Sequence, residues 1–142
     1  MTPPEGIVEH INPPGLFQSP AFSQVVTVTG PVRTVYVGGQ NAVTAEGELV
    51  GVGDLGAQTD QVMANIQVAL AAAGARLEHV VKFTVLVVDG HDITPGFAAF
   101  QRAWGDRGDP PLVTAAWVAG LANPEFLVEV EAIAVVPLPA GS

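Results

Sequence analysis

The sequence has 142 residues, of which 49% are hydrophobic and 13% are charged, and it contains no cysteine. This length is about that of one compact domain, so we predict a single domain over residues 1–142. Without thiols the chain cannot form disulfides, carry a catalytic thiolate or bind zinc through cysteine. Fourteen acidic and five basic residues give a net charge of -9. We therefore expect no nucleic-acid partner, because that binding depends on Lys and Arg side chains that neutralise phosphates.

The amino-terminal residues lack the basic start of a secretory signal. The first basic residue is Arg33, and Glu5 and Glu9 interrupt the apolar residues before it. The longest apolar runs, residues 68–75 and 80–88, are much shorter than the roughly 20 residues that span a bilayer. We expect a cytoplasmic protein with no membrane partner.

The first forty residues predict a lead-in followed by two strands. Residues 1–20 contain five prolines, which remove hydrogen-bond donors, so we predict an irregular segment. Residues 22–29 (FSQVVTVT) and 34–40 (TVYVGGQ) have strand-like composition. Because Gly30-Pro31 lies between them as a turn signal, we predict that the two strands pair with each other in an antiparallel hairpin.

A change of period marks the first helix. Val62, Ile66 and Leu70 recur at helical spacing, which predicts a helix over residues 55–73. Asp54 stands where a helix cap is preferred. This assignment also explains why residues 51–56 (GVGDLG) match the Gly-x-Gly-x-x-Gly pattern without forming a dinucleotide site. The Asp54 carboxylate would lie where a pyrophosphate must bind, and no acidic residue follows at the spacing that suits a ribose.

Four further elements complete the predicted fold. We expect a buried strand over residues 80–88, a helix over 95–104, and closing strands over 113–118 and 126–135. This order predicts an α+β domain with a mixed sheet and two helices on one face. The strands are apolar on both sides, so the other sheet face is expected to pack against further copies of the chain.

Two groups of polar residues are candidates for chemistry. Asp89, His91 and Asp92 cluster after a predicted strand, but one imidazole and two carboxylates have no diagnostic metal-binding spacing. We interpret them as a solvated loop and predict no metal. Glu129 and Glu131 are two apart on the last predicted strand, so they leave the same face of it. Paired carboxylates can divide acid and base roles, or simply keep an exposed strand soluble.

Five segments together resemble a known family. They are FSQVV at 22–26, VYVGGQ at 35–40, the helix at 58–65, AAAGARLEHVVKFTVLV at 71–87 and LVEVEAIAV at 127–135. In this order they resemble the Rid family of reactive intermediate deaminases, also called YjgF-like or the L-PSP endoribonuclease type. The resemblance covers roughly residues 15–136. It implies a chorismate-mutase-like α+β protomer in a homotrimer packed through its sheets, with clefts between neighbouring subunits.

The resemblance also implies an activity. Members of the deaminase branch hydrolyse reactive enamines and imines, such as 2-aminoacrylate, to keto acids and ammonia without a cofactor. In that branch an arginine binds the substrate carboxylate, and a glutamate on the last strand helps to place the attacking water. The glutamate matches Glu129, the implied catalytic residue, but Val113 occupies the arginine position and no Lys or Arg follows Arg107.

The remaining family positions are mostly apolar here. The implied ligand-binding residues are Phe22, Gly38, Gly39, Phe97, Val113, Ala115 and Trp117. Hydrogen bonds between charged groups contribute about 1.5 to 3 kcal/mol each, so the loss of the arginine predicts at least tenfold weaker binding of a 2-imino acid. We therefore expect a trimer that binds, and could hydrolyse, a small neutral or apolar imine or enamine.

Two other interpretations remain open on the sequence. The chain could be a non-catalytic ligand-binding, regulatory or chaperone-like trimer whose own apolar side chains fill the cleft. Alternatively, ordinary deaminase activity could persist through a displaced base such as Arg102 or Arg107. RNA cleavage is disfavoured by the acidic surface and by the lack of a suitably placed histidine pair.

Overall fold

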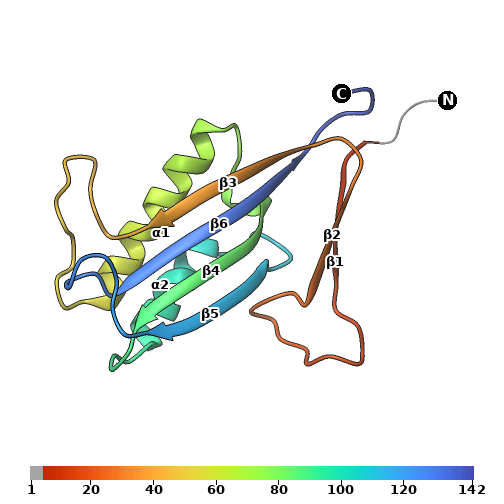
Figure 1. The fold of residues 1–142 in the computed structure, drawn as a ribbon. Coiled ribbons are helices and arrows are strands. Elements are labelled where there is room, and N and C mark those ends of the chain that lie inside the picture. The colour runs from red at the N-terminus through yellow and green to blue at the C-terminus, as the bar shows by residue number, and fades with distance from the viewer. Residues whose placement is uncertain (1–4) are drawn as a thin grey trace.

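A four-stranded mixed sheet with both helices on one face forms the body of the molecule (Figure 1). The computed structural model describes residues 5–142. The strands, in spatial order, are β3 (Val32–Gln40), β6 (Val128–Pro137), β4 (Val80–Val88) and β5 (Leu112–Val118). β6 is antiparallel to both β3 and β4, whereas β4 and β5 are parallel. The predicted α+β fold, with a mixed sheet and two helices, is confirmed.

The first two strands form a separate antiparallel hairpin that stands apart from this sheet (Figure 1). They are β1 (Ile7–Ile11) and β2 (Val25–Thr29). Two predictions are wrong here: the lead-in contains a strand, and the strands on either side of Gly30-Pro31 do not pair with each other. Gly30 adopts a φ of 83°, which turns the chain away from β2. β3 then pairs with β6, and that pairing buries apolar side chains that a free hairpin would leave in water.

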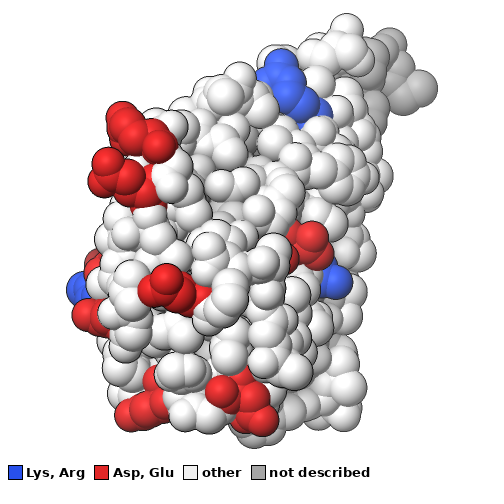
Figure 2. Space-filling view, turned by 60° about the vertical axis from the view of Figure 1, so that its left-hand side comes forward, with Lys and Arg blue, Asp and Glu red and all other residues white. Residues whose placement is uncertain are grey.

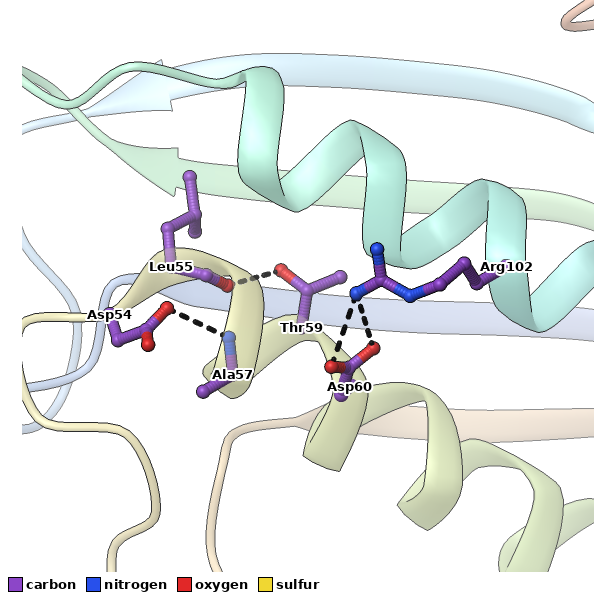
Figure 3. Close-up of polar contacts among 6 residues, drawn as sticks. All are labelled: Asp54, Leu55, Ala57, Thr59, Asp60 and Arg102. Carbon is purple, nitrogen blue, oxygen red and sulfur yellow. Dashed lines mark hydrogen bonds and ion pairs between the residues drawn. The ribbon is translucent and has the colours of Figure 1, made fainter.

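The helices follow the predicted pattern closely. α1 (Leu55–Ala72) begins at Asp54, whose carboxylate accepts a hydrogen bond of 3.0 Å from the Ala57 backbone nitrogen (Figure 3). The short 3-10 helix η1 (Leu77–His79) comes directly before β4, and α2 (Thr94–Trp104) follows that strand. Within residues 5–142, neither helix is long and apolar enough to cross a membrane.

The core lies between the helices and one face of the sheet. Alternate residues of β6 point into it, and Phe83 of β4 is fully buried with its ring edge-on to Phe100 of α2 at 5.2 Å. Within residues 5–142 no helix covers the opposite face of the sheet, which we call the open face. Its side chains include Tyr36, Lys82, Thr84, Leu86, Thr114, Ala116, Glu129, Glu131 and Ile133. Tyr36 is 77% exposed there.

Candidate functional site

A cavity of about 140 Å³ lies between α2 and the strands β4 and β5. Four of the residues that the sequence indicated line it together: Phe22, Phe97, Val113 and Ala115. The other lining residues are Ala21, Leu55, Thr59, Val85, Val87, Ile93, Gly96, Phe100, Val128 and Val130. We call this space the apolar cavity, because only one residue of its lining has a polar side chain.

The sheet register and one tethered segment assemble this lining. In the parallel pair of strands, Val113 lies opposite Phe83 and therefore on the helix-covered face. Phe22 is held beside the start of β5 by its neighbour Ser23, whose hydroxyl donates a hydrogen bond of 2.6 Å to the Pro110 carbonyl oxygen. The Ser23 backbone nitrogen donates to the Pro111 carbonyl oxygen at 3.0 Å. These two hydrogen bonds hold Phe22 close to the start of β5, about ninety residues later in the sequence.

The polar group in the lining is already satisfied. The Thr59 hydroxyl donates a hydrogen bond of 2.8 Å to the Leu55 carbonyl oxygen one turn earlier in α1 (Figure 3). An uncompensated charge in such surroundings would lose its hydration without gaining a partner. The apolar cavity therefore favours a neutral or apolar group and disfavours a carboxylate.

The two arginines that could replace the missing carboxylate-binding arginine form other contacts. Arg102 pairs with Asp60 of α1, with nitrogen–oxygen distances of 3.2 and 3.3 Å (Figure 3). Arg107 donates from Nη1 to the carbonyl oxygens of Ala103 and Trp104, at 2.6 and 2.7 Å. Among residues 5–142 no Lys or Arg lines the apolar cavity.

Glu129 lies on the other side of the sheet. It is opposite Leu86 in the register, half-buried, and belongs to the open face, whereas its neighbours Val128 and Val130 line the apolar cavity. Gly39 lies directly beside it: a Cβ atom on Gly39 would be 2.9 Å from the Glu129 carboxyl carbon. The resemblance implied clefts between neighbouring subunits, and within one chain the structure places the implied residues on two faces of the sheet.

A β-bulge shapes the strand next to Glu129. The register of β3 shifts between Val37 and Gln40, so Gly38 and Gly39 form the irregular part. Such bulges recur beside active sites, where they redirect backbone groups. Only Gly39 approaches Glu129, since a Cβ atom on Gly38 would meet no atom within 4 Å.

Trp117 is placed differently from the expectation. It lies opposite Val87 on the helix-covered face of β5, but it is 51% exposed and does not line the apolar cavity. The sequence reasoning instead missed the contributions of Ile93 and Phe100. The three-residue spacing of Phe97 and Phe100 in the sequence is the signal that places both rings on one side of the helix.

The loop before α2 uses its carboxylates locally. An oxygen of Asp92 accepts a hydrogen bond of 2.9 Å from the Thr94 backbone nitrogen. Hydrogen bonds from the backbone and side chain of Thr94 lower the pKa of Asp92. Asp89 accepts from the Gly90 backbone nitrogen at 2.9 Å. In the described part of the chain, no three His, Asp or Glu side chains gather as a metal site.

Comparison with known proteins settles the family. The sequence model of the family described as Endoribonuclease L-PSP matches residues 17–136. The chain belongs to this L-PSP family. Among solved structures, a conserved Rid family protein of unknown function from Yersinia pestis is 38% identical, with a TM-score of 0.79 over 89% of this chain and 97% of that one. The predicted Rid or YjgF-like membership is therefore confirmed.

Two curated relatives of this L-PSP family member widen the comparison. A RutC family protein of Pyrococcus abyssi is 37% identical over 114 residues, covering 80% of this chain and 84% of that protein. The 2-iminobutanoate/2-iminopropanoate deaminase of Rattus norvegicus is 35% identical over 116 residues, covering 81% and 80%. The family thus includes proteins named as deaminases.

Proposed function

We propose that the protein assembles as a homotrimer whose clefts between subunits bind a small neutral or apolar imine or enamine and hydrolyse it. The observation that carries this proposal is the division of the site between two faces. Glu129 and the apolar cavity lie on opposite sides of one sheet, so they can share a ligand only if two copies of the chain meet. A head-to-tail contact of that kind closes into a ring when its rotation is 120°.

The size and lining of the apolar cavity support the substrate class. A volume of about 140 Å³ is close to that of engineered cavities of roughly 150 Å³ that bind benzene. Val113 stands where a carboxylate-binding arginine would be needed. We therefore propose an imine with one ring or a short branched chain, and no carboxylate.

In the proposed reaction, Glu129 of a neighbouring copy orients a water molecule. The carboxylate takes one proton from the water as the water oxygen bonds to the imine carbon, and it passes this proton to the nitrogen, which has received the electron pair of the C=N π bond. In the resulting carbinolamine the carboxylate takes the hydroxyl proton and gives it to the nitrogen. The C–N bond then breaks, ammonia leaves with that electron pair, and the carbonyl forms. An enamine enters this sequence after protonation at carbon. Gly39 allows the ligand and the Glu129 side chain to approach the backbone closely.

Ammonia release tests the proposal directly. The protein is supplied with the imine that an amine oxidase forms from 1-phenylethylamine and, separately, with 2-iminopropanoate formed from alanine by an amino acid oxidase. We expect faster hydrolysis of the neutral imine, loss of that acceleration in Glu129→Gln, and no loss in the matched control Glu131→Gln. Preference for 2-iminopropanoate, or full activity in Glu129→Gln, would overturn it.

A second function is favoured by one observation. The lining of the apolar cavity offers no unsatisfied polar side chain, because the Thr59 hydroxyl is already bonded to Leu55. The same fold would then serve as a non-catalytic ligand-binding, regulatory or chaperone-like trimer. This function predicts binding of the neutral imine's ketone product, acetophenone, without any acceleration of ammonia release. Hydrolysis of 2-iminopropanoate that is lost in Arg102→Gln or Arg107→Gln would instead indicate an ordinary deaminase.

A further inference from the structure

A second and larger hollow, of about 430 Å³, adjoins the apolar cavity. The two share Ala21, Phe97 and Phe100 as walls. The remaining lining residues are Pro20, Gln101, Trp104, Gly105, Asp106, Gly108, Pro110 and Pro111. We call this hollow the α2 groove, because it runs along one side of that helix to its carboxyl end. From Phe97 to Gly105 the helix rises about 12 Å.

The chemistry of the α2 groove differs from that of the apolar cavity. Its helix side is a stripe of Phe97, Phe100, Gln101 and Trp104, whose spacing of three and four places them in one row. Asp106 adds a carboxylate at the far end. Within residues 5–142 no ion pair joins Asp106 to a Lys or Arg side chain.

One basic side chain, Arg107, lies at the same end of α2 as Asp106 but is outside the groove lining. Arg107 follows Asp106 in sequence, and its Nη1 is bonded to two carbonyl oxygens at the end of α2. The chain as a whole has a net charge of -9. Figure 2 shows acidic side chains spread over one face of the molecule, with few basic ones among them. An aromatic row that ends in a carboxylate is suited to an organic cation.

We propose that the α2 groove is a second subsite, which holds the ammonium end of an elongated amine while its apolar end occupies the apolar cavity. This inference rests on the proposed function for the role of the apolar cavity. It extends the substrate class from small neutral imines to imines that carry a remote amino group. The aromatic rings contact the chain between the two ends, and Asp106 binds the ammonium group.

Four probes test the subsite on the full-length protein by calorimetry: toluene, 6-phenylhexylamine, 6-phenylhexan-1-ol and 6-phenylhexanoate. We expect the amine to bind about threefold to tenfold more tightly than the alcohol, the range that an exposed ion pair with a cation–π contact provides. The carboxylate should bind most weakly. Equal affinities for amine and alcohol would overturn the proposal.

Two variants that remove the same charge distinguish attraction of the amine by the groove from attraction by the net negative charge of the whole protein. Asp106→Asn should abolish the preference for amine over alcohol. Asp109→Asn removes the same charge three residues away, at an exposed position outside the groove lining, and should leave the preference intact. If both variants lower it equally, the attraction is long-range and the subsite is refuted.

Two filling variants distinguish this proposal from the proposed function. Gln101→Trp should weaken all three tailed probes at least tenfold and leave toluene binding unchanged, because it fills only the α2 groove. Val113→Phe should abolish toluene binding. If toluene fails to bind the unaltered protein but the amine still depends on Asp106, the apolar cavity is refuted and the groove stands. If toluene binds and Gln101→Trp has no effect, the groove is refuted alone.

Discussion

The two faces of the central sheet use the same strands in opposite ways. In β6, Val128, Val130 and Ala132 are buried under the helices, whereas Glu129 and Glu131 alternate with them on the open face. One side therefore forms the core within a single chain. The other carries two carboxylates and the 77% exposed Tyr36, and no helix in the described part of the chain covers it. The fold is therefore formed within one chain, whereas the residues of the proposed site lie on two faces of its sheet.

The largest expected effect is the loss of stability from a substitution on the helix-covered face of the sheet. Phe83 is fully buried and contacts two aromatic rings edge-on, so Phe83→Ala should lower the free energy of unfolding by about 3 to 5 kcal/mol. Urea unfolding followed by circular dichroism measures this. Val68→Ala, at an apolar α1 residue that is 73% exposed, is the control and should stay within about 0.5 kcal/mol. Equal losses in both variants would contradict this account of the core.

The next largest effect is expected from a charge placed on the open face, which would weaken the proposed trimer contact. Leu86 lies opposite Glu129, so Leu86→Asp puts two carboxylates where the proposed trimer contact forms. Like charges at an interface cost several kcal/mol, and we expect at least about a hundredfold weaker association by sedimentation, with the folded protomer retained. The control Val52→Asp alters a loop residue that is 64% exposed and should not change the oligomer. A trimer unaffected by Leu86→Asp would show that the chains meet elsewhere.

A smaller change at the bulge tests the position of the carboxylate. The Cβ atom of Gly39→Ala would meet the Glu129 side chain at 2.9 Å, so that flexible side chain must move. A catalytic group displaced by about 1 Å can cost up to about a hundredfold in rate. We expect ammonia release to fall at least tenfold with an unchanged melting temperature. Gly38→Ala, whose Cβ would contact nothing within 4 Å, should retain activity.

The smallest effect concerns the start of α1 and should leave both faces intact. Asp54→Ala removes the side-chain acceptor for the Ala57 nitrogen and should cost about 1 kcal/mol, measured by thermal unfolding. Asp54→Asn supplies an equivalent oxygen and should restore most of that stability. If the asparagine variant is as unstable as the alanine one, the charge rather than the cap is responsible.

The elements that depend on local pattern were predictable from the sequence. α1 ends one residue before the predicted boundary, and β4 has the predicted bounds of residues 80–88, because apolar period and capping are read within a few turns. The pairing of β2 was not predictable in this way. Its partner β1 lies in a proline-rich segment, and the partner of β3 is nearly a hundred residues away. The choice of pairing partner for each strand therefore depends on contacts between residues that are far apart in the sequence.

The residues of the candidate site could be named from the sequence, but their arrangement could not. Phe22, Phe97 and Val113 line the apolar cavity together, and their role as ligand-binding residues stays a prediction. Glu129 does not join them, because a strand alternates its faces and Val128 and Val130 already point into that cavity. The sequence of one chain does not reveal which of the two faces would be completed by a neighbouring copy in the proposed trimer.

The hairpin of β1 and β2 has a consequence for how the molecule opens. At the base of the hairpin, the Gly6 nitrogen donates a hydrogen bond of 3.1 Å to the Leu138 carbonyl oxygen. Among residues 5–142, neither strand of the hairpin pairs with the four-stranded sheet. Two strands alone are marginally stable in water, so this arm should exchange its amide protons much faster than the main sheet. If the amide protons of the hairpin alone exchange more slowly when the protein concentration is raised, that slowing would report subunit contact independently of global unfolding.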